Sequence, residues 1–344
     1  MTLAQPNTPK PKRAKATIAV LLVIALAATA FTVVVSYSVA SPQEPDTVNP
    51  EPQLSGNEAS GWQFIKTVLA IDTEKYNATV KSFDPPSPSF ATEEQNANFP
   101  IDVQYHLNCS QSTLSIFCTF IQNKLAAAHL YLYTGTVLTR QPLSSNLTEA
   151  AINFLTAYQN FSGRNLTEMF QTLDGINLVN GSTVQLGDLK FNSTHRDLTG
   201  TAFGDSVDFR WLNIYSGCEY WALQLSFQDG HFGSFIDNRQ WYQIGDTTVN
   251  ISRQQAIDIA LNAAESYSYK MSDDWWISDF NITYTDATLY PQSRGSVWYP
   301  CWTVNLYFDK TYPGSVHGII VFVWAGSGEI EKIGNIAYTT PTDY

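Results

Sequence analysis

The sequence predicts an α+β fold, with one N-terminal transmembrane helix followed by tandem modules in which a helix packs on an antiparallel sheet. Three observations lead to this prediction. The first is an uncharged apolar run near the N-terminus of the 344-residue chain. The second is a set of three helical stretches, each with an apolar stripe. The third is the group of runs after each helix in which apolar and polar residues alternate, as in half-buried strands.

The apolar run covers residues 16–35 and has Thr as its only polar residue type. A helix rises ~1.5 Å per residue, so a run of this length spans the roughly 30 Å of a bilayer's hydrocarbon core. Four basic residues and no acidic ones precede it. By the positive-inside rule, residues 1–15 are then a cytoplasmic basic tail. We expect a transmembrane helix over 16–38 and a cell-membrane location, single-pass, with the C-terminal bulk extracellular.

Two other interpretations of this run stay open. Ser38-Val39-Ala40 has the small-x-small pattern at which a signal peptidase cuts. A pilin-like signal, cut before the apolar helix, is the other, although the run has no acidic residue near its start. Residues 39–60 are rich in Pro and acidic residues, so we expect them to form a Pro-rich acidic stalk.

The charge balance argues against several function classes. Residues 41–344 contain 15 basic and 31 acidic residues, a net charge of −16, which disfavours nucleic acid as a partner. The sequence has no HExxH, GxSxG, Walker A, GxGxxG or EF-hand motif, and its five histidines are scattered. We therefore expect no catalytic residues, no metal and no cofactor, and predict that the chain is not an enzyme.

The helical stretches divide the rest of the chain into units. Trp62, Ile65 and Leu69 mark the first helix, and a stripe from Ala151 to Tyr158, with a possible cap at Asn146, marks the second. The third follows a capping box made by Ser252 and Gln255. Strands with turn residues between them follow each helix, and Ala325 to Gly328 read as a hairpin turn. The predicted modules are 61–145, 146–246 and 247–344.

The last module resembles a PepSY domain. The stretch from Asn250 to Ala260 resembles the helix that opens this family, of the type (I/V)(S/T)xxxAIxIA. Trp302 to Leu306 resembles its WxVxL strand, and Ile320 to Ile330 its VxVxAxxGEI strand-turn-strand. The resemblance covers about 250–338 and extends less fully to 146–244. It departs from the family at Trp324, where Asp is usual, and at 270–296, an insertion. It implies PepSY-like or cystatin-like modules and a non-catalytic, extracytoplasmic role in binding or inhibiting peptidases.

Candidate binding residues gather in one patch. Paired tryptophans beside carboxylates can stack on a sugar or receive an aromatic or basic side chain of a peptide. The alternative is that one tryptophan completes the core of the third module while the acids cap a turn. The residues are Asp273, Asp274, Trp275 and Trp276.

Cysteines and glycosylation sequons fit an extracellular compartment. The cysteines predict disulfides, for which we favour Cys109–Cys118 and Cys218–Cys301, with free buried thiols as the alternative. Nine Asn-x-Ser/Thr sequons are candidate glycosylation sites, as expected for a glycoprotein of an archaeal or eukaryotic surface. They lie at Asn77, Asn108, Asn146, Asn160, Asn165, Asn180, Asn192, Asn250 and Asn281.

These observations lead to one main functional hypothesis. We expect a non-catalytic extracytoplasmic binding or regulatory protein, held in the membrane by its N-terminal helix, whose partner is a surface peptidase, a peptide or a glycan. One alternative is a structural surface, adhesion or pilin-like protein. The other is a secreted glycosidase or peptidase, for which Asp205 and Asp208 are the candidate acid pair.

Overall fold

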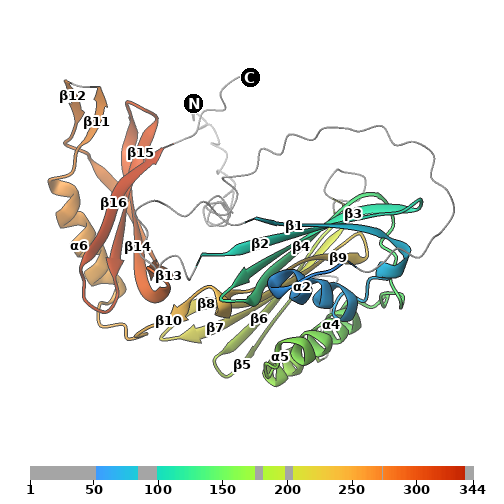
Figure 1. Ribbon diagram of the computed structural model, residues 1–344. Coiled ribbons are helices and arrows are strands. Elements are labelled where there is room, and N and C mark those ends of the chain that lie inside the picture. The colour runs from blue at the N-terminus through green and yellow to red at the C-terminus, as the bar shows by residue number, and fades with distance from the viewer. Residues whose placement is uncertain (1–51, 84–98, 175–180, 198–203, 273, 338–344) are drawn as a thin grey trace, which may run out of the picture. The chain divides into compact units, whose positions relative to one another are not determined.

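The computed structural model describes residues 52–83, 99–174, 181–197, 204–272 and 274–337. Within these residues the chain forms sixteen strands and four α-helices, so the protein is mostly β (Figure 1). The strands build a nine-stranded sheet, a five-stranded sheet and a two-stranded hairpin.

The nine-stranded sheet is antiparallel throughout, in the order β1-β2-β3-β4-β9-β8-β7-β6-β5. Its two halves are both meanders in which each strand pairs with its neighbour in sequence. They meet where β4 pairs with β9 through Ala127↔Ile236, Ala128↔Phe235 and His129↔Ser234. The strands are β1 (Asn77–Phe83), β2 (Ile101–Asn108), β3 (Ser112–Ile121), β4 (Lys124–Gly135), β5 (Ser182–Leu186), β6 (Leu189–Arg196), β7 (Ser206–Tyr215), β8 (Cys218–Gln228) and β9 (His231–Asp237).

Three helices cover one face of this sheet: α2 (Gly56–Thr67), α4 (Leu147–Ser162) and α5 (Thr167–Thr172) (Figure 1). They share a single hydrophobic core with the strands beneath them. At its centre Phe154 of α4 lies 5.1 Å from the ring of Phe235 and 6.3 Å from that of Phe64 of α2. These aromatic contacts tie β9 to both long helices.

Helix α2 comes unusually close to the sheet at Gly61. A Cβ atom at this position would collide with the ring of Tyr105 on β2, so the absence of a side chain is required. The Tyr105 hydroxyl donates a hydrogen bond of 2.6 Å to the carbonyl oxygen of Glu58, which holds the first turn of the helix against the strand.

The five-stranded sheet has its own helix and its own core. Its strands are β10 (Gln243–Ile244), β13 (Ile282–Arg294), β14 (Val297–Tyr312), β15 (Val316–Trp324) and β16 (Ile330–Ala337), and its helix is α6 (Arg253–Glu265). Strand β10 pairs in parallel with β14, while the other pairs are antiparallel. The remaining hairpin consists of β11 (Tyr269–Ser272) and β12 (Trp275–Ile277).

The local predictions for the helices are confirmed. The Asn146 side chain caps α4 by accepting from the backbone amides of Thr148 and Glu149. Ser252 and Gln255 form the predicted capping box of α6. The turn between Ala325 and Gly328 connects β15 to β16 as predicted.

The predicted α+β fold of separate helix-on-sheet modules is wrong. Strands from 61–145 and 146–246 belong to one sheet, because β4 and β9 satisfy each other's edge hydrogen bonds instead of leaving two exposed edges. The expected transmembrane helix over 16–38 lies outside the described residues, as does most of the stalk over 39–60. In the part of the chain that the structure describes, no helix is both long and apolar enough to cross a bilayer.

The shared core predicts how fragments behave. A fragment of residues 146–246 should not fold alone, because it leaves β9 without β4 and Phe154 without Phe64. A fragment of 52–246 should fold. Circular dichroism with urea unfolding checks both, with 247–344 as the comparison because that segment has its own core. A cooperative unfolding transition for 146–246 would contradict the single-sheet assignment.

Candidate functional site

The candidate site is a cleft of about 220 Å³ that combines aromatic rings, amides and one guanidinium group. A cleft of this size suits one side chain or one small ligand unit, since drug-sized ligands occupy roughly 300–1,000 Å³. All its lining residues are at least partly accessible. They are Asn213, Trp221, Asn238, Arg239, Tyr242, Ile244 and Trp298.

The short segment that follows β9 builds one wall of this cleft. Here the chain makes a 3-10 turn, η2 (Asn238–Gln240), and enters β10. Hydrogen bonds from the amide of Gln243 to Ser296 (2.8 Å) and from that of Gly245 to Trp298 (2.9 Å) fix the segment beside β14. The Tyr242 ring stacks on that of Trp298 with the centroids 4.4 Å apart. The aromatic wall is therefore held in place without a ligand.

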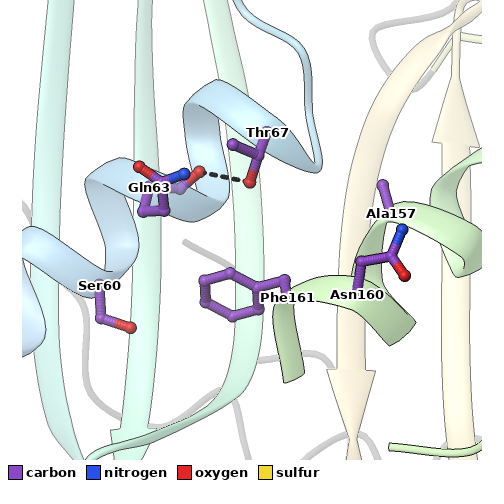
Figure 2. A pocket seen from close by; sticks show the side chains of 6 residues that line it. All are labelled: Ser60, Gln63, Thr67, Ala157, Asn160 and Phe161. Atoms are coloured by element: carbon purple, nitrogen blue, oxygen red, sulfur yellow. Dashed lines mark hydrogen bonds between the residues drawn. The ribbon is translucent and has the colours of Figure 1, made fainter. Parts of the chain in front are cut away.

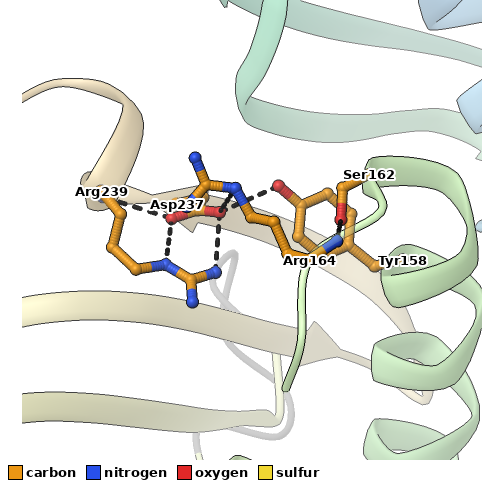
Figure 3. A network of polar contacts seen from close by, with 5 residues as sticks. All are labelled: Tyr158, Ser162, Arg164, Asp237 and Arg239. Carbon is orange, nitrogen blue, oxygen red and sulfur yellow. Dashed lines mark hydrogen bonds and ion pairs between the residues drawn. The ribbon is translucent and has the colours of Figure 1, made fainter.

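A buried carboxylate holds the guanidinium of Arg239. Asp237, the last residue of β9, has no exposed surface. It accepts two hydrogen bonds of 2.8 Å from Arg239, through Nε and one terminal nitrogen. Figure 3 shows the other terminal nitrogen pointing away from Asp237. Because a guanidinium has five N–H donors in a fixed fork, this arrangement fixes its orientation and leaves donors for a ligand.

The same carboxylate binds two groups from the helical layer. The Tyr158 hydroxyl of α4 donates to it at 2.9 Å, and Arg164, just after α4, forms an ion pair with it at 3.9 Å (Figure 3). Burial, followed by the nearby Asp237, raises the pKa of Tyr158, so this group is neutral at physiological pH. Two cations thus face one anion, and the cluster carries a net positive charge in a chain whose net charge is −12.

A second arginine packs against one ring of the cleft lining. The guanidinium of Arg210 lies over the ring of Trp221, with 5.6 Å from its central carbon to the ring centroid. Among the described residues, the buried Nε of Arg210 and Nε1 of Trp241 have no hydrogen-bond partner. Both atoms are buried and neither residue lines the cleft, so they do not face a ligand bound there.

A second hollow of about 560 Å³ lies between α2 and α4 (Figure 2). Residues Ser60, Gln63 and Thr67 of α2 face Ala157, Asn160 and Phe161 of α4. We call this hollow the interhelical groove.

The predicted tryptophan patch lines neither the cleft nor the second hollow. Trp275 and Trp276 on β12 are 51% and 58% exposed, so neither completes the core of the C-terminal unit. Successive residues of a strand point to opposite faces, which separates the two rings. Asp274 is exposed as well, and Asp273 lies outside the described residues. Their role in ligand binding stays a prediction.

All four cysteines are free thiols in the structure. The register contradicts the favoured Cys109–Cys118 pair: Cys109 lies beside Ser112, whereas Cys118 pairs with Val103. Six residues along a strand separate the two by about 20 Å, and a disulfide needs Cα atoms within about 7 Å. The Cys218–Cys301 pair stays a prediction.

The candidate glycosidase acids are engaged in separate ion pairs. Asp208 is buried and bound to Arg196 at 2.6 Å, while Asp205 contacts His195 at 2.7 Å. Neither belongs to the cleft lining.

Sequence reasoning missed the cleft. In the sequence, nothing local distinguishes Arg239 from an ordinary turn residue. Trp221 and Trp298 lie in two strands, β8 and β14, and their spacing along the chain does not show that they line one cavity.

Comparisons with known proteins give little further evidence. No family model and no curated protein matches the chain. Among solved structures, the Bacillus megaterium YpeB C-terminal domain is similar over 82% of this chain and 98% of its own, at 10% identity and a TM-score of 0.29. At that score the likeness carries no argument about fold or function, and PepSY remains a resemblance in the sequence.

The buried ion pair predicts a large effect on stability. Asp237→Asn should lower the free energy of unfolding by about 3–5 kcal/mol, because it leaves Arg239 and Arg164 without their anion. Asp205→Asn is the matched control and should cost less than about 1 kcal/mol, since that carboxylate is 42% exposed. Urea unfolding measures both variants. Equal losses in the free energy of unfolding would show that the buried carboxylate stabilises the fold no more than the exposed one.

Burial predicts an order of thiol reactivity. It raises the pKa of Cys218 to about 11 and that of Cys301 to about 12, and it also raises that of Cys118. These thiols are protonated at pH 8, so the more accessible Cys109 should react first with iodoacetamide in the folded protein. Peptide mass mapping over time gives the order. Early labelling of Cys118 would contradict it.

Proposed function

We propose that this chain is a non-catalytic, membrane-anchored binding protein of the outer cell surface, and that its cleft takes the carboxylate end of a peptide. The observation that carries the proposal is the Arg239 guanidinium, fixed by buried Asp237 beside an aromatic wall. A preorganised guanidinium binds a carboxylate without the entropy cost of ordering a free side chain.

The rest of the lining supports the same ligand. Trp221, Tyr242 and Trp298 offer ring faces for an apolar or aromatic side chain. The amides of Asn213 and Asn238 can pair with peptide N–H and C=O groups. Among the residues that line the cleft there is no carboxylate, imidazole or thiol to act as base or nucleophile, which favours binding over turnover.

The sequence adds the partner class and the location. The PepSY resemblance over 250–338 implies the binding or inhibition of peptidases, and peptide ends are what peptidases bind and produce. The apolar run at 16–35 and its basic flank favour a single-pass anchor with this cleft outside the cell. In its more specific form, the proposal is that the protein inhibits a peptidase.

A pair of matched peptides tests the ligand class. The full-length protein in detergent is titrated calorimetrically with Ala-Ala-Ala-Phe as the free acid and as the C-terminal amide. The free acid should bind at least about tenfold more tightly, because a hydrogen bond to a charged group contributes about 1.5–3 kcal/mol. Trp221→Ala should weaken binding of the free acid.

Controls separate this result from its alternatives. Tyr290→Ala removes a 46% exposed aromatic ring outside the cleft lining and should change nothing. Equal affinities for the free acid and the amide would show that the cleft does not recognise the peptide carboxylate. If an oligogalacturonate binds more tightly than the peptide, and Trp221→Ala weakens that binding, the ligand class is an acidic glycan instead of a peptide. Cleavage of either peptide would contradict the non-catalytic assignment.

A further inference from the structure

We infer that Asn160 carries an N-linked glycan whose first sugar units lie in the interhelical groove between α2 and α4. Asn160-Phe161-Ser162 is a sequon at the C-terminal end of α4. Of the eight sequon asparagines in the described residues, only Asn160 lines one of the two hollows. Its side chain is exposed and therefore open to modification.

The groove is built from two facing stripes. Ser60, Gln63 and Thr67 have helical spacing on α2, and Ala157, Asn160 and Phe161 have it on α4, so each set lies on one side of its helix. The Phe64 and Phe161 rings, 5.7 Å apart, pack where the two helices meet. Small side chains at Ser60 and Ala157 leave space between the helices, as Figure 2 shows.

The lining suits a sugar better than an apolar helix or peptide. Gln63, Ser60 and Thr67 supply amide and hydroxyl groups that can pair with sugar hydroxyls. The ring of Phe161 can pack against the apolar face of a pyranose, as aromatic rings with polar neighbours do. The volume of about 560 Å³ exceeds what one side chain fills.

Several other sequon asparagines make side-chain hydrogen bonds, whereas Asn160 makes none among the described residues. The side-chain amides of Asn250 and Asn281 donate to Gly326 and Asp309. Asn146 uses its oxygen to cap α4. Asn160 is among the residues that line the groove, and in Figure 2 its amide lies beside Ala157 and points away from the side chains of α2. A glycan there would bridge two helices, instead of extending from a turn.

The modification requires a glycosyl donor from the secretory membrane. The Asn160 Nδ2 atom forms a bond to the anomeric carbon of a polyprenyl-phosphate-linked oligosaccharide and loses one proton. The bond between that carbon and the phosphate oxygen breaks, and the lipid phosphate leaves with the electron pair. The reaction occurs on the extracytoplasmic side, where this segment is expected to lie.

Mass spectrometry of the full chain, purified from a secretory eukaryotic host, tests occupancy. The peptide that contains Asn160 should carry a glycan in the native sequence and in Ser162→Thr, which keeps the sequon. It should be unmodified in Ser162→Ala and Asn160→Gln. An unmodified Asn160 in the native sequence overturns the inference, whether or not other sequons are occupied, and leaves the peptide titration unaffected.

Thermal unfolding tests the position of the glycan. Asn160→Gln should lower the melting temperature by roughly 2–4 °C, a shift that about one lost hydrogen bond gives in a domain of this size. Asn77→Gln, at a sequon outside the groove, should not lower it.

A double-mutant cycle decides whether the sugar contacts α2. Gln63→Ala should lower the melting temperature of the glycosylated protein and have no effect in the Asn160→Gln background. Glu168→Ala, an exposed change outside the groove, should act equally in both. Equal effects of Gln63→Ala in the two backgrounds would mean that the glycan extends into solvent, and would overturn its placement in the groove.

Discussion

The three-residue pairing of β4 with β9 is the constraint on which the rest of the larger sheet depends. It turns two edge strands into interior strands, so that α2 and α4 pack on the same face of one continuous sheet. The interhelical groove exists because both helices are held side by side on that sheet. Asp237 follows the paired residues directly, so the register that joins the two meanders also positions the carboxylate under Tyr158.

The two hollows differ in the physics that shapes them. Few charges are available in this chain, and two of its arginines gather around one buried acid beside the cleft, whose lining includes one of them. Electrostatic orientation therefore dominates there, and the aromatic wall adds contact area. The groove contains neutral polar groups over an aromatic base, so shape and individual hydrogen bonds decide what it accepts. A single ligand class would not suit both.

The sequence was sufficient for features that depend on near neighbours. Helix periodicity and the Ser252–Gln255 capping box are local, and both appear as predicted. Strand partners are not local: Ala127 and Ala128 fit an edge or an interior strand equally well, so the single sheet could not be predicted. The Cys109–Cys118 pair failed for the same reason, since proximity in sequence does not give register. Arg239 was missed because the carboxylate that orients it, Asp237, is also bound by Tyr158, which is 79 residues away from Asp237 along the chain.

The Asp237–Arg239 pair also has a consequence for how this protein can change over evolutionary time. Loss of the cation would leave a buried acid unpaired, and loss of the acid would leave the cation unpaired. Either change would destabilise the fold. Substitutions at the two positions are therefore expected to occur together or not at all. A descendant that needed a different ligand would more readily alter Trp221 or Asn238, which carry no such partner, and would retain the arginine as a fixed element of an otherwise variable cleft.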